Sequence, residues 1–154
     1  MRITRDGFAE RIKEYKVPMY RLAYGILKNQ ADAEDAVGET VMKAWECLHT
    51  LRDADKFRPW IMSITANEAK KIYRNRKRID LTEDAGSKSA GQSDRHDDLW
   101  EIVLSLDEKY RTVIILYYYE ELKIREISDV LKITEGTVKS RLSRAKERLR
   151  VMLA

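Results

Sequence analysis

The stretch KIREISDVLKITEGTVKSRLSRAKERL, residues 123–149, carries two apolar repeats that are separated by a short break. In the first half, apolar side chains recur at every third or fourth position, at Ile124, Ile127 and Leu131. The same spacing returns after the break, at Val138, Leu142, Ala145, Leu149 and Met152. Residues three and four apart share one face of an α-helix. The stretch therefore predicts two amphipathic helices joined by a tight turn.

The residues at the break indicate how the second helix begins. Thr134 is placed to cap it, because a threonine hydroxyl accepts a hydrogen bond from a first-turn amide. Ile133 and Val138 form a candidate hydrophobic staple, which fixes the angle at which the helix leaves the turn. This arrangement is typical of a helix-turn-helix, in which the second helix enters a groove of DNA.

The second helix is strongly basic, with six Lys and Arg residues in 138–150 against one acid, Glu147. Such a helix could lie on a membrane, enter a protein groove or enter the major groove of DNA. Its apolar stripe is narrow and contains Ala145, which suits packing on a neighbouring helix better than membrane insertion. Short serines beside the cations suit contact with bases and phosphates. DNA is favoured, and the other two partners remain alternatives.

The composition also favours a polyanionic partner. Charged residues make up 36% of the 154 residues, against a typical ~25%, but the net charge is only +4. The positive charge is concentrated, since residues 70–78 carry six further basic side chains and no acid. Two separate basic patches point to nucleic acid more strongly than the net charge does.

Several classes of protein are not expected. A single cysteine, Cys47, excludes an internal disulfide framework and a cysteine-rich zinc site. The sequence offers no metal-ligand spacing, no phosphate-binding glycine loop and no nucleophile beside a base, so we expect no metal, no cofactor and no enzyme. The longest apolar run, 113–119, is far shorter than the ~20 residues that span a bilayer. The N-terminus lacks a secretion signal. We expect a cytoplasmic protein without direct membrane insertion.

The fold class is predicted to be all-α, because nearly every patterned stretch has helical spacing. Pro18 is expected to break the first helical segment, Asp32 to cap the next helix, and a long helix to start near Lys56.

The chain is expected to form two small helical domains. Residues 80–96 lack periodicity and have the composition of a flexible linker. The predicted division is a helical domain in residues 1–79, the linker, and a helix-turn-helix domain in residues 97–154.

Three stretches resemble bacterial RNA polymerase sigma factors of the extracytoplasmic-function (ECF) group of the sigma-70 family. They are DAEDAVGETVMKAW (32–45), FRPWIMSITANEAKKIYRNRKR (57–78) and LDEKYRTVIILYYYEELKIREISDVLKITEGTVKSRLSRAKERLR (106–150), in family order and at family spacing. The resemblance implies a transcription initiation factor that binds core RNA polymerase, recognises minus-ten and minus-thirty-five promoter elements and helps to melt the DNA. A stand-alone helix-turn-helix regulator is the alternative.

The resemblance also implies site residues and partners. The helix over 32–48 would dock on the β′ clamp helices of core RNA polymerase through Asp35, Glu39, Thr40 and Lys43, with Trp45 in the core. The residues matching the minus-ten surface are Leu51, Arg52, Lys56, Ala66, Asn67, Lys70 and Arg74. Those matching the minus-thirty-five surface are Lys139, Ser140, Ser143 and Arg144, with Arg141, Lys146 and Arg148 on phosphates or in support. Besides promoter DNA, an anti-sigma factor is an expected partner.

The sequence departs from the family at three positions. Gly38 replaces a common glutamine, Asp107 replaces a proline, and Lys132 replaces the glycine usual in the turn of the helix-turn-helix. A positive φ at Lys132 would strain the backbone by roughly 1 kcal/mol or more, unless the turn takes another geometry.

Overall fold

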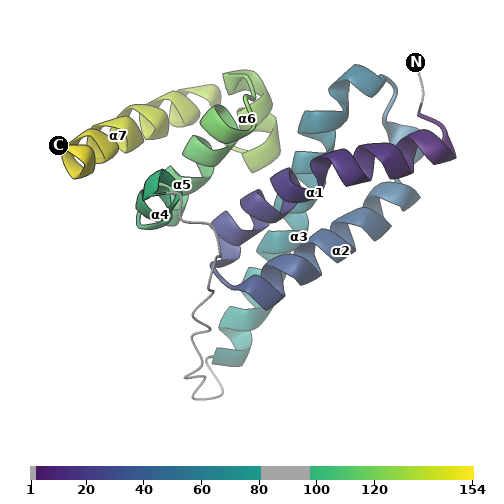
Figure 1. Ribbon diagram of the computed structural model, residues 1–154, viewed down its shortest axis with the longest axis horizontal. Helices are drawn as coiled ribbons and strands as arrows, with labels where there is room; N and C mark the ends of the chain where they lie inside the picture. Colours follow the sequence, from purple (N-terminus) through teal and green to yellow (C-terminus); the bar gives the residue numbers. More distant parts are fainter. Residues whose placement is uncertain (1–2, 81–97) are drawn as a thin grey trace.

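The computed structural model describes residues 3–80 and 98–154, and all regular structure in these residues is helical (Figure 1). The predicted all-α fold class is confirmed. The elements in chain order are α1 (Arg5–Leu27), α2 (Gln30–Glu46), η1 (Leu48–Thr50), η2 (Ala54–Lys56), α3 (Phe57–Asp80), α4 (Asp98–Leu104), α5 (Glu108–Ile114), η3 (Ile115–Tyr119, a π-helical turn), α6 (Ile124–Leu131) and α7 (Glu135–Leu153).

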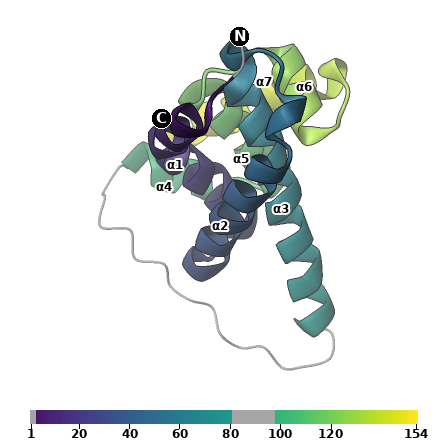
Figure 2. The same ribbon diagram turned by 90° about the vertical axis from the view of Figure 1, so that its right-hand side faces the viewer.

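The amino-terminal unit, residues 3–80, consists of α1, α2 and α3 packed on one another. Each helix contributes apolar side chains to one core, including Met19, Leu22, Ala33, Ala36, Ala44, Phe57 and Ile61. Small alanines on α2 allow the helix axes to approach closely. The basic end of α3 extends beyond the other two helices (Figure 2), so its cations lie in solvent.

The predicted break at Pro18 is wrong, because α1 runs without interruption from Arg5 to Leu27. A proline inside a helix removes one backbone hydrogen bond and costs about 3 kcal/mol. Tyr15, Met19 and Leu22 are buried on the two sides of the proline. Their packing against α2 and α3 holds the two halves in one helix.

The predicted cap at Asp32 is also wrong. The Asn29 side chain caps α2 by accepting a hydrogen bond from the amide of Asp32 at 2.9 Å. The Asp32 carboxylate, which is buried, accepts a 2.7 Å hydrogen bond from the Arg76 guanidinium on α3. Asp32 therefore ties α2 to α3 and does not start the helix.

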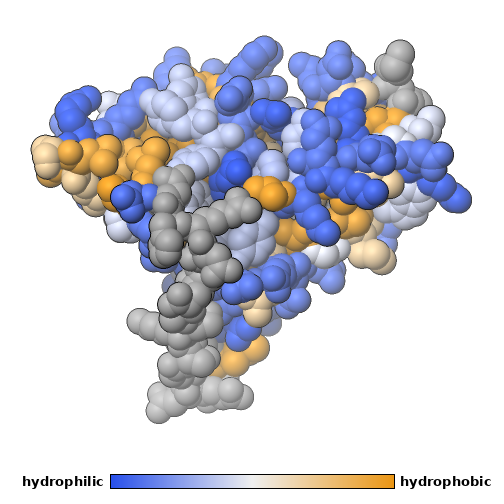
Figure 3. Space-filling view, viewed as in Figure 1, coloured by the Kyte–Doolittle hydropathy of each residue, from blue (hydrophilic) through white to orange (hydrophobic). Residues whose placement is uncertain are grey.

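The carboxyl-terminal unit, residues 98–154, contains the predicted helix-turn-helix, formed by α6 and α7. Thr134 caps α7 as predicted, since its hydroxyl accepts a hydrogen bond from the Thr137 amide at 3.1 Å. Val138, Leu142 and Ala145 are buried against α5 and α6. The stripe becomes exposed toward the C-terminus, where Val151, Met152 and Leu153 add to an apolar patch at the end of the chain (Figure 3).

The two units pack directly against each other. Helix α6 lies along α3, and α5 with η3 lies against α1, as Figure 2 shows for the α3 side. The sequence did not predict this contact. The predicted linker, apart from residue 80, lies outside the described residues, and the domain limits stay predictions.

Candidate nucleic-acid interface

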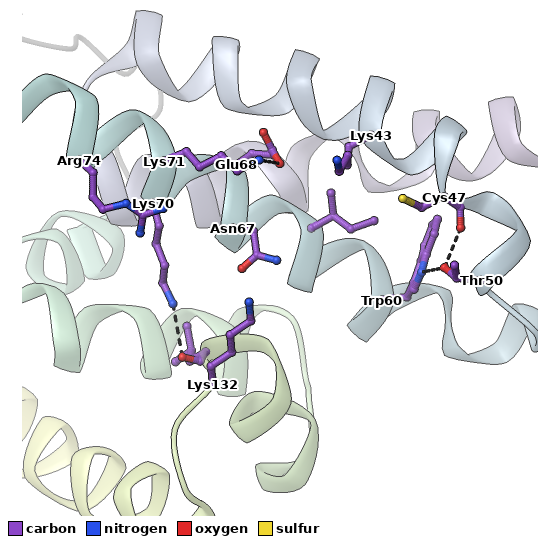
Figure 4. Close-up of a pocket in the computed structure, with 12 residues that line it drawn as sticks. Lys43, Cys47, Thr50, Trp60, Asn67, Glu68, Lys70, Lys71, Arg74 and Lys132 are labelled. Atoms are coloured by element: carbon purple, nitrogen blue, oxygen red, sulfur yellow. Dashed lines mark hydrogen bonds and ion pairs between the residues drawn. The ribbon is translucent and has the colours of Figure 1, made fainter.

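One face of α3 lines a groove at the contact between the two units (Figure 4). Asn67, Lys70 and Arg74 form the α3 wall, and Leu131 and Lys132 from the helix-turn-helix form the opposite wall. The groove has a volume of about 710 Å³. We call it the α3 groove. Three of the predicted minus-ten residues thus meet in one concave surface.

The end of the α3 groove that is nearest the start of α3 is built from that part of α3, from the end of α2 and from η1. The Trp60 indole donates a hydrogen bond to the Thr50 hydroxyl at 3.2 Å, which holds one ring edge of the tryptophan at the wall. Cys47 lies beside them and is half-buried. Neither contact follows from sequence spacing.

Lys70 has the most perturbed environment in the α3 groove. Its ammonium donates a hydrogen bond to the Leu131 carbonyl at 3.3 Å. Burial lowers the pKa of Lys70 from its ordinary 10.5; Glu108 opposes the shift, and cations including Lys132 and Arg74 add to it. A partly desolvated ammonium among other cations favours binding of an anion such as a phosphate.

Two predicted minus-ten residues are not on the surface. Ala66 and Leu51 are buried in the core of the amino-terminal unit, so their side chains cannot contact DNA in this structure. Both belong to the hydrophobic core. Arg52 and Lys56, also predicted, are exposed on the loop before α3.

The outer face of α7 presents most of the predicted minus-thirty-five residues together. Lys139, Ser140, Ser143 and Arg144 are exposed, and Arg141 is half-buried. A second hollow of about 400 Å³ is lined by Ser140, Arg141, Arg144 and residues of α5 and the α7 start. The arrangement provides hydroxyl and guanidinium groups on one helix face, the chemistry that reads base edges and phosphates.

Tyr110 on α5 is a positioning residue that the sequence did not reveal. Burial acts to raise the pKa of its phenol, but a hydrogen bond with Arg144 and the charges of Lys109 and Arg148 lower it overall. The Arg148 guanidinium also lies 4.9 Å from the centre of the Tyr110 ring. Tyr110 therefore lies against two predicted DNA-binding arginines. No local pattern links positions 110 and 144, so only the packing of α5 on α7 reveals it.

The Lys146 side chain, unlike those of the other predicted minus-thirty-five residues, packs on the tyrosines of η3. Its ammonium lies 5.6 Å and 5.7 Å from the centres of the Tyr117 and Tyr118 rings. These cation–π contacts orient the side chain toward η3.

The outer face of α2 carries two of the four predicted polymerase-binding residues, Asp35 and Glu39, whereas Lys43 lines the α3 groove. Asp35, Glu39 and Lys43 are exposed, but Thr40 is fully buried and donates a hydrogen bond to the Ala36 carbonyl at 2.6 Å. The Thr40 side chain is therefore not available to a partner. Trp45, expected in the core, is 44% exposed and packs against the Phe8 ring at 5.3 Å.

In the two described ranges, no three His, Cys, Asp or Glu side chains are placed to hold a metal ion. None of the helices described there combines the length and the apolar character needed to cross a membrane.

Comparisons with known proteins agree with this layout. Residues 11–79 match the family model described as Sigma-70 region 2, and residues 96–149 match that of Sigma-70, region 4. The RNA polymerase sigma factor SigV of Bacillus subtilis is 35% identical over 146 residues, covering 92% of this chain and 88% of SigV. The ECF RNA polymerase sigma factor SigW of the same organism is 31% identical over 168 residues, covering 97% of this chain and 90% of SigW.

Solved structures give the same result. The sigma factor RpoE of Bartonella quintana, in complex with the anti-sigma factor NepR, superimposes with a TM-score of 0.81 at 25% identity, covering 97% of this chain and 98% of RpoE. CnrH, in complex with the cytosolic domain of CnrY, shares the fold with a TM-score of 0.68, covering 97% of this chain and 89% of CnrH. The chain belongs to the sigma-70 family of RNA polymerase sigma factors, in its extracytoplasmic-function group, and acts in transcription initiation.

Proposed function

We propose that this sigma factor binds core RNA polymerase in the cytoplasm through the outer face of α2 and reads promoter DNA with two surfaces. The α3 wall of the α3 groove, with Asn67, Lys70 and Arg74, holds the minus-ten element as an unpaired strand, and the outer face of α7 reads the minus-thirty-five duplex. The observation that carries this assignment is the presence of two basic faces on separate units, α3 with Asn67 and Lys70, and α7 with Ser140 and Arg144.

The chemistry of each surface suits its element. The α3 groove combines an amide with cations, and an amide can read a base edge while cations hold single-strand phosphates. The α7 face lies on a helix that follows a tight turn, which suits the major groove of a duplex. The sigma factor supplies binding energy for strand opening, and the polymerase supplies the catalysis.

We further propose that an anti-sigma factor regulates this protein. Two of its structural relatives, RpoE and CnrH, were solved with NepR and with the cytosolic domain of CnrY respectively. The alternative of a stand-alone regulator is not favoured, because it leaves the match of residues 11–79 to Sigma-70 region 2 without a role.

Transcription in vitro with purified core polymerase and a pool of promoters tests the assignment. Arg144→Ala should weaken binding to the minus-thirty-five duplex by roughly 5- to 150-fold, the range for a lost base contact. Asn67→Ala should leave duplex binding intact and reduce the permanganate reactivity of the minus-ten strand. Lys13→Ala, an exposed change on α1 away from both surfaces, is the control.

Two results would contradict the assignment. If the chain fails to bind core polymerase, the proposed polymerase contact is wrong. If both variants initiate at the parent's rate from a matched promoter, the DNA surfaces are wrongly placed.

A further inference from the structure

The contact between the two units is built around one buried acid. The Glu120 side chain, which directly follows η3, is only 2% exposed, and its carboxylate accepts a 2.6 Å hydrogen bond from Arg21 of α1. Arg58 of α3 donates to the backbone carbonyl of the same residue at 2.8 Å. Two helices of the amino-terminal unit, α1 and α3, therefore both hydrogen-bond to Glu120 of the carboxyl-terminal unit. A buried ion pair of this kind specifies an arrangement even where its net stabilisation is small.

The absence of a side chain at Gly25 allows α1 and η3 to approach each other closely at the contact between the two units. Gly25 of α1 is buried, and a Cβ at this position would overlap with the Ile115 side chain of η3. The buried Arg111 side chain donates one hydrogen bond to the Gly25 carbonyl and another to the Leu106 carbonyl at 2.7 Å. Apolar packing and directed hydrogen bonds thus occur together, as in the interior of a single domain.

This contact covers part of the surface assigned to the minus-ten element. Lys70 uses one of its donors on the Leu131 carbonyl of α6. Leu131 and Lys132 form the wall of the α3 groove that faces Asn67 (Figure 4). A DNA strand that binds along α3 must compete for Lys70 and must move α6 aside. The outer face of α7 remains exposed.

We propose that this arrangement is an autoinhibited resting state of the sigma factor, in which its own helix-turn-helix unit docks on α1 and α3 and covers the minus-ten surface. The inhibitory surface is η3, Glu120 and α6, and its partner is the chain's own amino-terminal unit. Opening moves the α6 wall away and exposes Asn67, Lys70 and Arg74 of α3, while duplex binding by α7 needs no opening. The proposal rests on the assignment of the α3 groove to the minus-ten element.

The contacts that hold the two units together lie within one chain. The superposition with RpoE covers 97% of this chain at a TM-score of 0.81, so both units take a similar relative position in a relative solved with its anti-sigma factor. In this chain, the contacts of Glu120, Gly25 and Lys70 are all intramolecular. The proposed closed state therefore needs no contact from a second protein.

Two variants open the contact by different means, and each has a matched control. Gly25→Leu inserts bulk against Ile115, whereas Gly38→Leu places the same side chain where no atom lies within 4 Å. Glu120→Lys puts a third cation beside Arg21 and Arg58, whereas Glu121→Lys changes an exposed neighbour. Adding Arg21→Glu to Glu120→Lys restores an ion pair and should close the contact again.

The full chain is measured by small-angle X-ray scattering and by anisotropy of a fluorescein-labelled 12-nucleotide single strand of random sequence. We expect a parent radius of gyration near the ~15 Å of a compact chain of this length, and an increase in both opening variants but in neither control. If about 90% of the parent is closed, opening should tighten single-strand binding by about tenfold. Circular dichroism checks that each variant is folded.

Each outcome is decisive. An unchanged radius in both opening variants overturns the closed state, whatever the transcription assay shows. Expanded variants that bind the single strand no better than the parent, yet initiate with core polymerase, overturn the occlusion and leave the sigma function intact. Failure of parent and open variants alike to initiate from the promoter pool overturns the proposed function instead, independently of the radius.

Discussion

Lys132 has a backbone conformation that a side chain makes costly. It ends α6 in the left-handed region, with φ 59° and ψ 45°, where an L-residue loses roughly 1–2 kcal/mol through the clash of its Cβ with the backbone. Lys132 therefore has the backbone strain that was expected because it stands where the family usually has glycine. The left-handed cap lets the chain reverse between α6 and α7. It also brings the Lys132 side chain to the α3 groove.

We expect Lys132→Gly to raise the free energy of unfolding by on the order of 1 kcal/mol relative to Lys132→Ala. Both substitutions remove the ammonium, but only glycine removes the Cβ that causes the strain. Urea denaturation of the two variants gives the difference. Equal stabilities would show that the turn relaxes around the side chain.

At the scale of the element, α7 depends on α5 for the orientation of its reading face. The basic face follows from the sequence pattern, but only the fold places Arg144 beside the Tyr110 phenol, where a hydrogen bond between them would orient the guanidinium. A long flexible side chain loses less entropy on binding when a neighbour already restrains it. Tyr110 itself is buried, so it acts through the arginine and does not contact DNA.

We expect Tyr110→Phe to weaken minus-thirty-five duplex binding by roughly fivefold, the equivalent of one hydrogen bond of about 1 kcal/mol. The ring that packs in the core is retained, so the melting temperature should change little. Anisotropy with a labelled promoter duplex provides the measurement. Tyr118→Phe removes the hydroxyl of a half-exposed tyrosine and serves as control; an equal loss in both variants would exclude a role for the Tyr110–Arg144 contact.

At the scale of the whole molecule, the buried acid between the units makes closure sensitive to pH. Burial raises the pKa of the Glu120 carboxyl above its ordinary 4.5, with Arg21 and Arg58 opposing the shift and Glu121 adding to it. An open arrangement returns the carboxyl to water and to its ordinary pKa. The closed arrangement therefore binds the proton more tightly. The Glu120 carboxyl stabilises the closed arrangement fully below pH 4.5, and this stabilisation is lost as the pH rises through the raised pKa.

We therefore expect the open fraction of the parent to rise as the pH is raised across that window, while the ion pair with Arg21 and the apolar contact at Gly25 keep the closed arrangement predominant. Glu120→Gln keeps a neutral hydrogen-bonding side chain at the position and should remain compact throughout. Scattering profiles at several pH values compare the two chains. An identical pH dependence in both would assign the effect to other groups.

The sequence by itself determined the parts of this protein that depend on local periodicity. The all-α fold, the helix-turn-helix, the Thr134 cap and the exposure of Lys139, Ser143 and Arg144 all follow from the 3.6-residue repeat and from capping chemistry. The motifs in family order also indicated the sigma-70 family correctly. These properties are encoded within one or two helical turns, so neighbouring residues suffice to read them.

Only the tertiary structure decided which side chains on those helices are available. Thr40 and Ala66 match binding positions of the family but are fully buried, because each is covered by a helix that is distant in sequence. Helix α1 continues through Pro18 for the same reason. The closure of the two units depends on Arg21 and Glu120, 99 residues apart. Local sequence patterns contain no information on such contacts, because folding of the whole chain is what brings these residues together.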